Sequence, residues 1–164
     1  MARAAHTRWW QIAEVIFGLP VLIAMGLQVL LPVHLPYGQF APIAVATGSL
    51  LGLASVVLII AARRELARHG QPTDPGLPTR RLVTTGVFAW SRNPLYLSAV
   101  LFLVGIALAG NLPWLIAALL PAVGLCHALL IIPEERYLAD TFGSAYQAYA
   151  AAVPRWVGLR QRHR

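Results

Sequence analysis

The stretch Leu82-Val83-Thr84-Thr85-Gly86-Val87-Phe88-Ala89-Trp90-Ser91-Arg92-Asn93-Pro94-Leu95-Tyr96 stands where a polar segment meets an apolar run. Asn93 is a favourable N-cap residue, because its side-chain oxygen can accept a hydrogen bond from an amide of the first helical turn. Pro94 suits the first helical position, which needs no N–H and matches its fixed φ. We therefore expect a helix to start at Leu95, with its unpaired amides beside Arg92. Such a helix start predicts an anion site, and a plain start with Arg92 on lipid phosphates fits the spacing equally well.

The composition is typical of an integral membrane protein. The chain has 164 residues, of which 58% are hydrophobic and 12% charged, and its mean hydropathy is +0.64. A soluble domain has about twice this charged fraction. At this length we expect one domain, residues 1–164.

Apolar runs predict four transmembrane helices, at about residues 12–33, 41–62, 95–109 and 112–132. The fold class is therefore all-α, an integral membrane protein. The third run rises only about 22 Å as a helix, so we expect a short span or one that begins within the interface near Trp90. Glu14 and His127 lie inside these runs, and their roles stay open.

Small residues recur along the second run, at Ala44, Gly48 and Gly52. In lipid, small residues four positions apart let a neighbouring helix approach closely. We expect this face to pack against another helix, and it could also border a path by which a lipid tail enters between helices.

The segment between the second and third runs, residues 63–93, is polar and rich in arginine and proline. Loops of this length without an apolar period are commonly functional or disordered. The prolines make the segment stiff, so we expect a folded loop.

The segment after the fourth run predicts an amphipathic helix on the cytoplasmic side. One face carries apolar residues three or four positions apart: Leu138, Phe142, Tyr146, Tyr149 and Val153. Glu134 and Glu135 stand at the end of the apolar run, where we expect them to meet the negative end of the helix dipole. A cationic ligand or Arg92 would offset that cost.

The arginines predict the orientation of the chain. All thirteen basic residues are arginines, and all lie before the first run, between the second and third, or after the fourth. By the positive-inside rule both termini and the long loop face the cytoplasm. The bias to arginine and alanine favours a bacterial inner membrane. The net charge of +7 reflects this topology and contact with anionic lipid, so we expect the bilayer as a partner and no nucleic acid.

This topology brings the loop 79–93, the helix start at Pro94 and the segment 134–143 to one cytoplasmic mouth. Anion-binding amides, carboxylates and aromatic side chains together suit a zwitterionic, partly flat ligand. S-adenosylmethionine is such a ligand, since it carries a carboxylate, an ammonium, a sulfonium and an adenine. On pattern alone it is one candidate among several.

These segments resemble the signatures of the isoprenylcysteine carboxyl methyltransferases and phospholipid methyltransferases. The first signature is residues 82–96, with Arg-Asn-Pro-x-Tyr as its core. The second comprises Glu134-Glu135, Leu138, Phe142-Gly143, Tyr146, Tyr149 and Val153-Pro154-Arg155. The resemblance covers roughly residues 73–155. It implies methyl transfer from S-adenosylmethionine to a lipophilic acceptor at the cytoplasmic membrane face, with the cofactor held by residues of about 73–96 and 134–155.

The resemblance also implies roles for single residues. The cofactor-binding residues would be Arg81, Leu82, Val83, Phe88, Asn93, Pro94, Leu95, Tyr96 and Glu134. Of these, Asn93 to Tyr96 would form the turn around the cofactor, and Glu134 would bind its polar end. As catalytic residues we expect Arg92, to steer an anionic acceptor group, and Tyr96, to orient either reactant. We predict no metal site.

The acceptor is a lipid or a prenylated molecule, and its reactive group stays open. An isoprenylcysteine-like carboxylate is the first candidate, although Leu130 stands where the eukaryotic isoprenylcysteine enzymes carry a substrate-side arginine. The amine of phosphatidylethanolamine is the alternative. A reductase that uses NADPH on an enone or a sterol, and a membrane scaffold without activity, are the other hypotheses.

Overall fold

The computed structural model describes residues 13–71 and 79–158. In these residues the elements are helical, which confirms the all-α class. In chain order they are α1 (Ala13–Leu30), η1 (Gly38–Phe40), α2 (Ala41–Arg68), η2 (Gly86–Ala89), α3 (Pro94–Ala109), α4 (Pro113–Cys126), η3 (His127–Ile131), α5 (Ile132–Phe142) and α6 (Ser144–Ala152). The terminal arginines, the side chain of Glu14 and residues 73–78 of the predicted cofactor region lie outside the described part.

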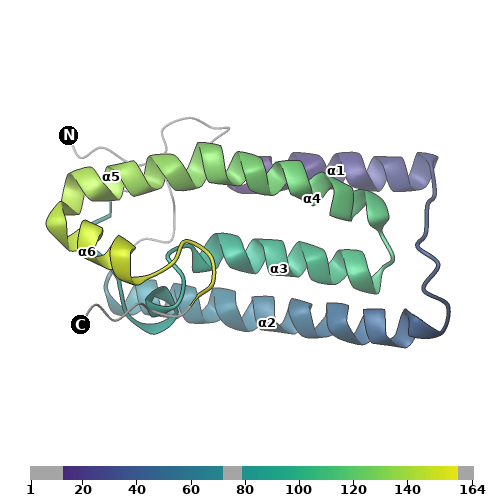
Figure 1. Cartoon of the computed structure of the whole chain (residues 1–164), viewed down its shortest axis with the longest axis horizontal. Coiled ribbons are helices and arrows are strands. Elements are labelled where there is room, and N and C mark those ends of the chain that lie inside the picture. Colours follow the sequence, from purple (N-terminus) through teal and green to yellow (C-terminus); the bar gives the residue numbers. More distant parts are fainter. Residues whose placement is uncertain (1–12, 72–78, 159–164) are drawn as a thin grey trace.

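Helices α1 to α4 lie side by side along the long axis of the molecule (Figure 1). Helix α2 packs on α3, α3 on α4, and α4 on α1. The turns that follow α1 and α3 lie at one end, whereas η2, α5 and α6 lie at the other (Figure 1). Each of the predicted apolar runs thus forms a helix, and successive helices run in opposite directions.

Helices α1 and α2 have ends that differ from the predicted ones. Helix α1 ends at Leu30, three residues early, because the proline at position 32 disfavours helical backbone at the residue before it. Helix α2 continues past residue 62 to Arg68, since the residues there are good helix formers. An ion pair of 3.4 Å between Arg68 Nη1 and Glu65 Oε2 supports this last turn.

The fourth apolar run continues without a break into the acidic segment. A π-helical turn, η3, joins α4 to α5, so the helix extends from Pro113 to Phe142. Glu134 and Glu135 therefore lie inside a continuous helix, and the prediction that they meet its negative end is wrong. The amphipathic segment is also divided, because Gly143 turns the chain with φ +54° between α5 and α6.

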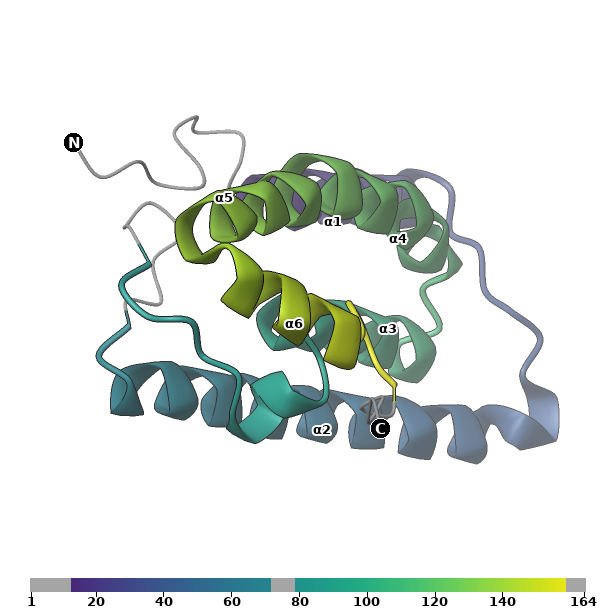
Figure 2. The same cartoon turned by 60° about the vertical axis from the view of Figure 1, so that its left-hand side comes forward.

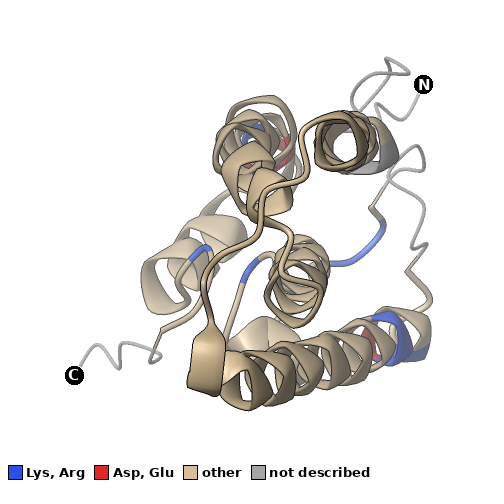
Figure 3. Ribbon diagram, turned by 90° about the vertical axis from the view of Figure 1, so that its right-hand side faces the viewer, with Lys and Arg blue, Asp and Glu red and all other residues tan. Residues whose placement is uncertain are grey.

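The fold is compatible with a membrane protein. Among the described helices, Gly38–Arg68 and Pro113–Phe142 are long and apolar enough to cross a bilayer, and Val15–Leu30 and Pro94–Ala109 are apolar but shorter. The four-span arrangement thus stays a prediction. Figure 3, seen from the end of the turns after α1 and α3, shows that end free of charged residues in the described chain.

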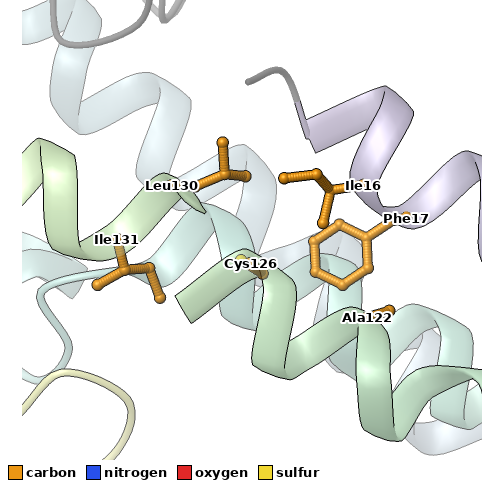
Figure 4. Packing of buried hydrophobic residues seen from close by; sticks show 6 residues of the cluster. All are labelled: Ile16, Phe17, Ala122, Cys126, Leu130 and Ile131. Atoms are coloured by element: carbon orange, nitrogen blue, oxygen red, sulfur yellow. The ribbon is translucent and has the colours of Figure 1, made fainter. Parts of the chain in front are cut away.

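A buried cluster attaches α1 to the long fourth helix. Ile16 and Phe17 of α1 point toward Ala122, Cys126 and Leu130 (Figure 4). The side chains of Cys126 and Leu130 have no exposed surface. Leu130, which stands at the position of the substrate-side arginine of the eukaryotic isoprenylcysteine enzymes, is therefore a core residue.

The close approach of α2 to α3 confirms the predicted packing face. A Cβ atom on Gly48 would lie 2.5 Å from the carbonyl oxygen of Gly105, and one on Gly105 would lie 2.6 Å from that of Gly48. About two turns further along α2, Ser55 Oγ donates a hydrogen bond of 2.7 Å to the carbonyl of Ser98. The two backbones touch, because glycine at these positions leaves no side chain between them.

Substitution of Gly48 should therefore separate α2 from α3. Gly48→Ala is expected to lower the free energy of unfolding by about 1–3 kcal/mol, because its Cβ would overlap backbone atoms. Gly52→Ala is the matched control on the same helix, since its Cβ would have nothing within 4 Å and alanine favours helix. Unfolding by dodecyl sulfate in mixed micelles measures both. Equal stability of the two variants would contradict the packing described here.

Reporter fusions test the four-span arrangement. Reporters in the turns 34–40 and 110–113 should read on the outer side of the membrane, and reporters within residues 70–80 should read on the cytoplasmic side. The reason is that the arginines lie on the latter side. A cytoplasmic signal from 110–113 would rule out the arrangement.

Candidate active site

The predicted helix start is tied to the segment that follows α6. The amide of Arg92 donates to the carbonyl of Pro154 at 3.0 Å. Asn93 Nδ2 and Ser91 Oγ both donate to the carbonyl of Arg155, at 3.0 Å and 3.2 Å. These hydrogen bonds hold residues 91–93 against residues 154–155.

Asn93 occupies the expected N-cap position, and α3 begins at Pro94. The expected capping hydrogen bond is not formed among the described residues, because the Asn93 side chain reaches Arg155 instead. That part of the prediction is wrong. The side-chain amide of Asn93 instead joins the start of α3 to the segment after α6. The local sequence pattern does not reveal this distant partner, the carbonyl of Arg155.

Glu135 of α5 lies between two guanidinium groups. Arg92 Nη1 is 2.9 Å from Glu135 Oε1, and Arg155 contacts the same carboxylate through Nε and Nη2 at 2.8–3.1 Å. The side chains of Arg92 and Glu135 are only 11% and 16% exposed, whereas that of Arg155 is 44% exposed. The hydrogen bonds from Arg155 to Glu135 raise the pKa of this arginine. The bidentate geometry is the strong form of this contact.

Tyr146 of α6 completes the cluster around Arg92. Its hydroxyl lies 3.1 Å from Arg92 Nη1, which donates a hydrogen bond to it. Burial raises the pKa of Tyr146, so the phenol stays protonated at neutral pH. We refer to Arg92, Glu135, Tyr146 and Arg155 as the arginine–glutamate cluster.

Glu134 faces a different helix from Glu135. Tyr96 Oη donates a hydrogen bond of 3.1 Å to Glu134 Oε2, which joins the first turn of α3 to α5. Neighbouring residues on a helix point about 100° apart, so the two carboxylates serve separate contacts. The structure thus brings together Arg92, Tyr96 and Glu134, all predicted site residues, at one end of the helices.

An open pocket of about 440 Å³ adjoins the cluster. It is lined by Arg92, Ile132, Glu135, Arg136, Ala139, Tyr146, Ala150 and Arg155. Among these residues three arginines face one carboxylate, so the lining is positive overall. Arg92 Nε is buried and has no hydrogen-bond partner in the described part of the chain. The pocket therefore suits a ligand with an anionic group.

The other predicted residues surround the cluster at different depths. Leu82 packs on the apolar faces of α5 and α6, together with Tyr146 and Tyr149. Val83 and Pro94 are buried, Phe88 and Leu95 are half-buried, and Arg81 is exposed. Asn93 and Pro94 separate Leu95 and Tyr96 from Arg92. Of the predicted site residues, Arg92 lines the pocket, and the nine predicted cofactor-binding residues are not part of its lining.

The prediction of site residues did not include Glu135, Tyr146 and Arg155. Each belongs to the second signature, which was the available signal. The ion pairs of Glu135 and Arg155 and the hydrogen bond to Tyr146 join residues distant in sequence, and spacing alone does not specify such partners. Among the described residues no group of three or more His, Cys, Asp or Glu could hold a metal ion.

Comparison with known protein families gives a match. A family model described as phospholipid methyltransferase matches residues 43–145. The matched part contains α2 except its first two residues, α3 to α5 and the predicted site residues, and ends just before Tyr146. Searches of curated proteins and of solved structures found no significant match.

Removing the charge of Glu135 should loosen this end of the molecule. Glu135→Gln is expected to lower the free energy of unfolding by about 1–3 kcal/mol, because it leaves the guanidinium of Arg92 buried without a counter-charge. Asp140→Asn, at an exposed position of the same helix, is the control. Thermal unfolding in detergent measures both. If Glu135→Gln were as stable as its control, the cluster would not contribute to stability.

Proposed function

Because the chain belongs to the phospholipid methyltransferase family, we propose that it transfers a methyl group from S-adenosylmethionine to a lipophilic acceptor at the cytoplasmic face of a membrane. The observation that supports this most directly is the pocket that the arginine–glutamate cluster lines. The family supplies the reaction class, and the cofactor and acceptor are our proposal.

The residues of the pocket fit S-adenosylmethionine. Its volume of about 440 Å³ is within the range of small-molecule sites. Arg136 and Arg155 provide positive charge for the carboxylate of the cofactor. Glu135 offers negative charge for an ammonium, and Tyr146 offers an aromatic surface. Opposite charges on one ligand match opposite charges in one pocket.

S-adenosylmethionine supplies an electrophilic methyl group on a sulfonium. The chain has to align the two reactants and exclude water, which can account for most of the rate of such a displacement. We assign Tyr96 to orient a reactant, because its hydroxyl is fixed by Glu134. We assign Arg92 to bind an anionic group of the acceptor. Its Nε would donate the hydrogen bond, since Nε has no partner in the described chain and Nη1 already contacts Glu135 and Tyr146.

An isoprenylcysteine-like carboxylate is the first candidate for the acceptor. A carboxylate is ionised at pH 7 and needs no base. The positive lining of the pocket favours it, because more arginines than carboxylates face this mouth.

The amine of phosphatidylethanolamine is the second candidate, and two observations favour it. Leu130, which stands in place of a substrate-side arginine, is fully buried in the core and offers no charge. Glu134 places a carboxylate beside Tyr96, where it would attract an ammonium group. An amine acceptor must lose a proton before it reacts.

Labelled methyl transfer in parallel to a prenylcysteine analogue and to phosphatidylethanolamine, across pH 6 to 9, tests the proposal. We expect a rate that is level with pH for a carboxylate acceptor and rises with pH for an amine. Arg92→Ala should lower kcat/KM by about tenfold to a hundredfold, the value of a charge-assisted hydrogen bond.

The outcomes separate the hypotheses. Labelling of the lipid amine alone would overturn the carboxylate assignment. Labelling of neither acceptor, together with thermal stabilisation by NADPH and none by S-adenosylhomocysteine, would overturn the proposed methyl transfer in favour of a reductase.

A further inference from the structure

Glu65 is a buried carboxylate outside the arginine–glutamate cluster. It lies near the end of α2 and is 8% exposed. Thr85 Oγ1 of the loop donates a hydrogen bond of 2.5 Å to Glu65 Oε1. This hydrogen bond is the main reason that the pKa of Glu65 is lowered, with smaller effects from His69 and Arg68. An ionised carboxylate therefore faces the loop.

Gly86 brings the loop backbone against the same carboxylate. Its φ of +58° lies in the left-handed region that glycine tolerates best. A Cβ atom here would lie 2.9 Å from both Cδ and Oε2 of Glu65. The carboxyl group fills the space that a side chain would need, so a substitution at Gly86 would displace the Glu65 carboxylate and strain the backbone.

The other side of the loop is held by α6. Tyr149 Oη donates a hydrogen bond of 2.7 Å to the carbonyl of Phe88. Burial raises the pKa of Tyr149, so its hydroxyl remains a donor. Figure 2 shows the short teal helix η2 between α2 and α6. The loop is therefore fixed from α2 by Glu65 and from α6 by Tyr149.

The fixed segment includes predicted cofactor-binding residues. Val83 precedes Thr85 by two positions, and Phe88 follows Gly86 by two. Arg92 follows Phe88 by four positions and belongs to the arginine–glutamate cluster. Any movement of the loop away from α2 would thus displace both groups of residues.

We propose that Glu65 is a positioning residue for cofactor binding, which fixes residues 83–90 against α2 through Thr85 and Gly86. This inference rests on the proposed function, since it assigns the loop to the S-adenosylmethionine site. Glu65 acts through the loop and makes no contact with the cofactor. Loss of the contact should weaken binding of the cofactor more than it affects the chemical step.

Thr85→Val tests the inference, because it removes the hydroxyl and keeps the shape of the side chain. Hydrogen exchange of residues 83–90 and equilibrium binding of labelled S-adenosylmethionine are measured on the full chain in detergent. We expect faster exchange and a Kd raised about tenfold, the loss of one hydrogen bond to a charged group. Thr85→Ser should restore both values. Thr141→Val is the matched control, since Thr141 Oγ1 donates to the carbonyl of Tyr137 within α5 itself.

A second variant keeps the inference testable if Thr85→Val folds poorly. Glu65→Gln retains an oxygen that can accept the Thr85 hydroxyl and should change the Kd less than Glu65→Ala does. Unchanged exchange and unchanged Kd in Thr85→Val would overturn the inference while the proposed function stands. Faster exchange with an unchanged Kd would also overturn it. If the unmodified protein binds no S-adenosylmethionine, the proposed cofactor fails, and the positioning role fails with it.

Discussion

The carboxylate of Glu135 joins parts of the chain that are far apart in sequence. It contacts Arg92, just before α3, and Arg155, just after α6. A carboxylate and a guanidinium that are largely removed from water need each other, because an unpaired buried charge is costly. The loop before α3 and the segment after α6 therefore meet at α5, and the pocket exists only where they meet. Tyr146 adds a neutral contact that keeps Arg92 on the pocket side of the cluster.

The charged residues of the described chain gather at one end of the molecule, which leaves the helices apolar along most of their length. The described helices present apolar side chains outward over most of their length, for example Leu22, Val29, Leu50 and Leu53. Association of such helices cannot rely on burying apolar surface, because lipid is as apolar as the side chains. Close backbone contact at Gly48 and Gly105, and the hydrogen bond from Ser55 to Ser98, supply the attraction instead.

Local sequence signals predicted the helices well and their long-range partners poorly. Pro94 and Gly110 gave the ends of α3 to within a residue, since backbone sterics act over a few positions. The packing face at Gly48 was predictable because small residues four positions apart let a neighbouring helix approach closely. The continuous helix through Glu134 and Glu135 was not, because acidic residues and Pro133 resemble a helix end when the tertiary contacts are unknown. Arg92, Tyr96 and Glu134 were placed at one mouth, and Arg92 was one of two expected partners for the acidic pair. The choice of Glu135 as its partner, and the second contact from Arg155, depend on geometry that no spacing encodes.

The π-helical turn at His127–Ile131 changes the rotational phase of α5 relative to α4, two segments that a regular helix would keep in one phase. A π turn holds one extra residue, and one residue changes the phase of everything downstream by about 100°. Upstream of the turn, the phase of α4 is fixed by packing against Phe17 of α1. Downstream, the phase of α5 aims Glu134 at Tyr96 and Glu135 at Arg92. The π turn thus sets the rotation of α5 relative to α4. As a result, α4 can present one face to the core while α5 directs its two carboxylates to Tyr96 and Arg92.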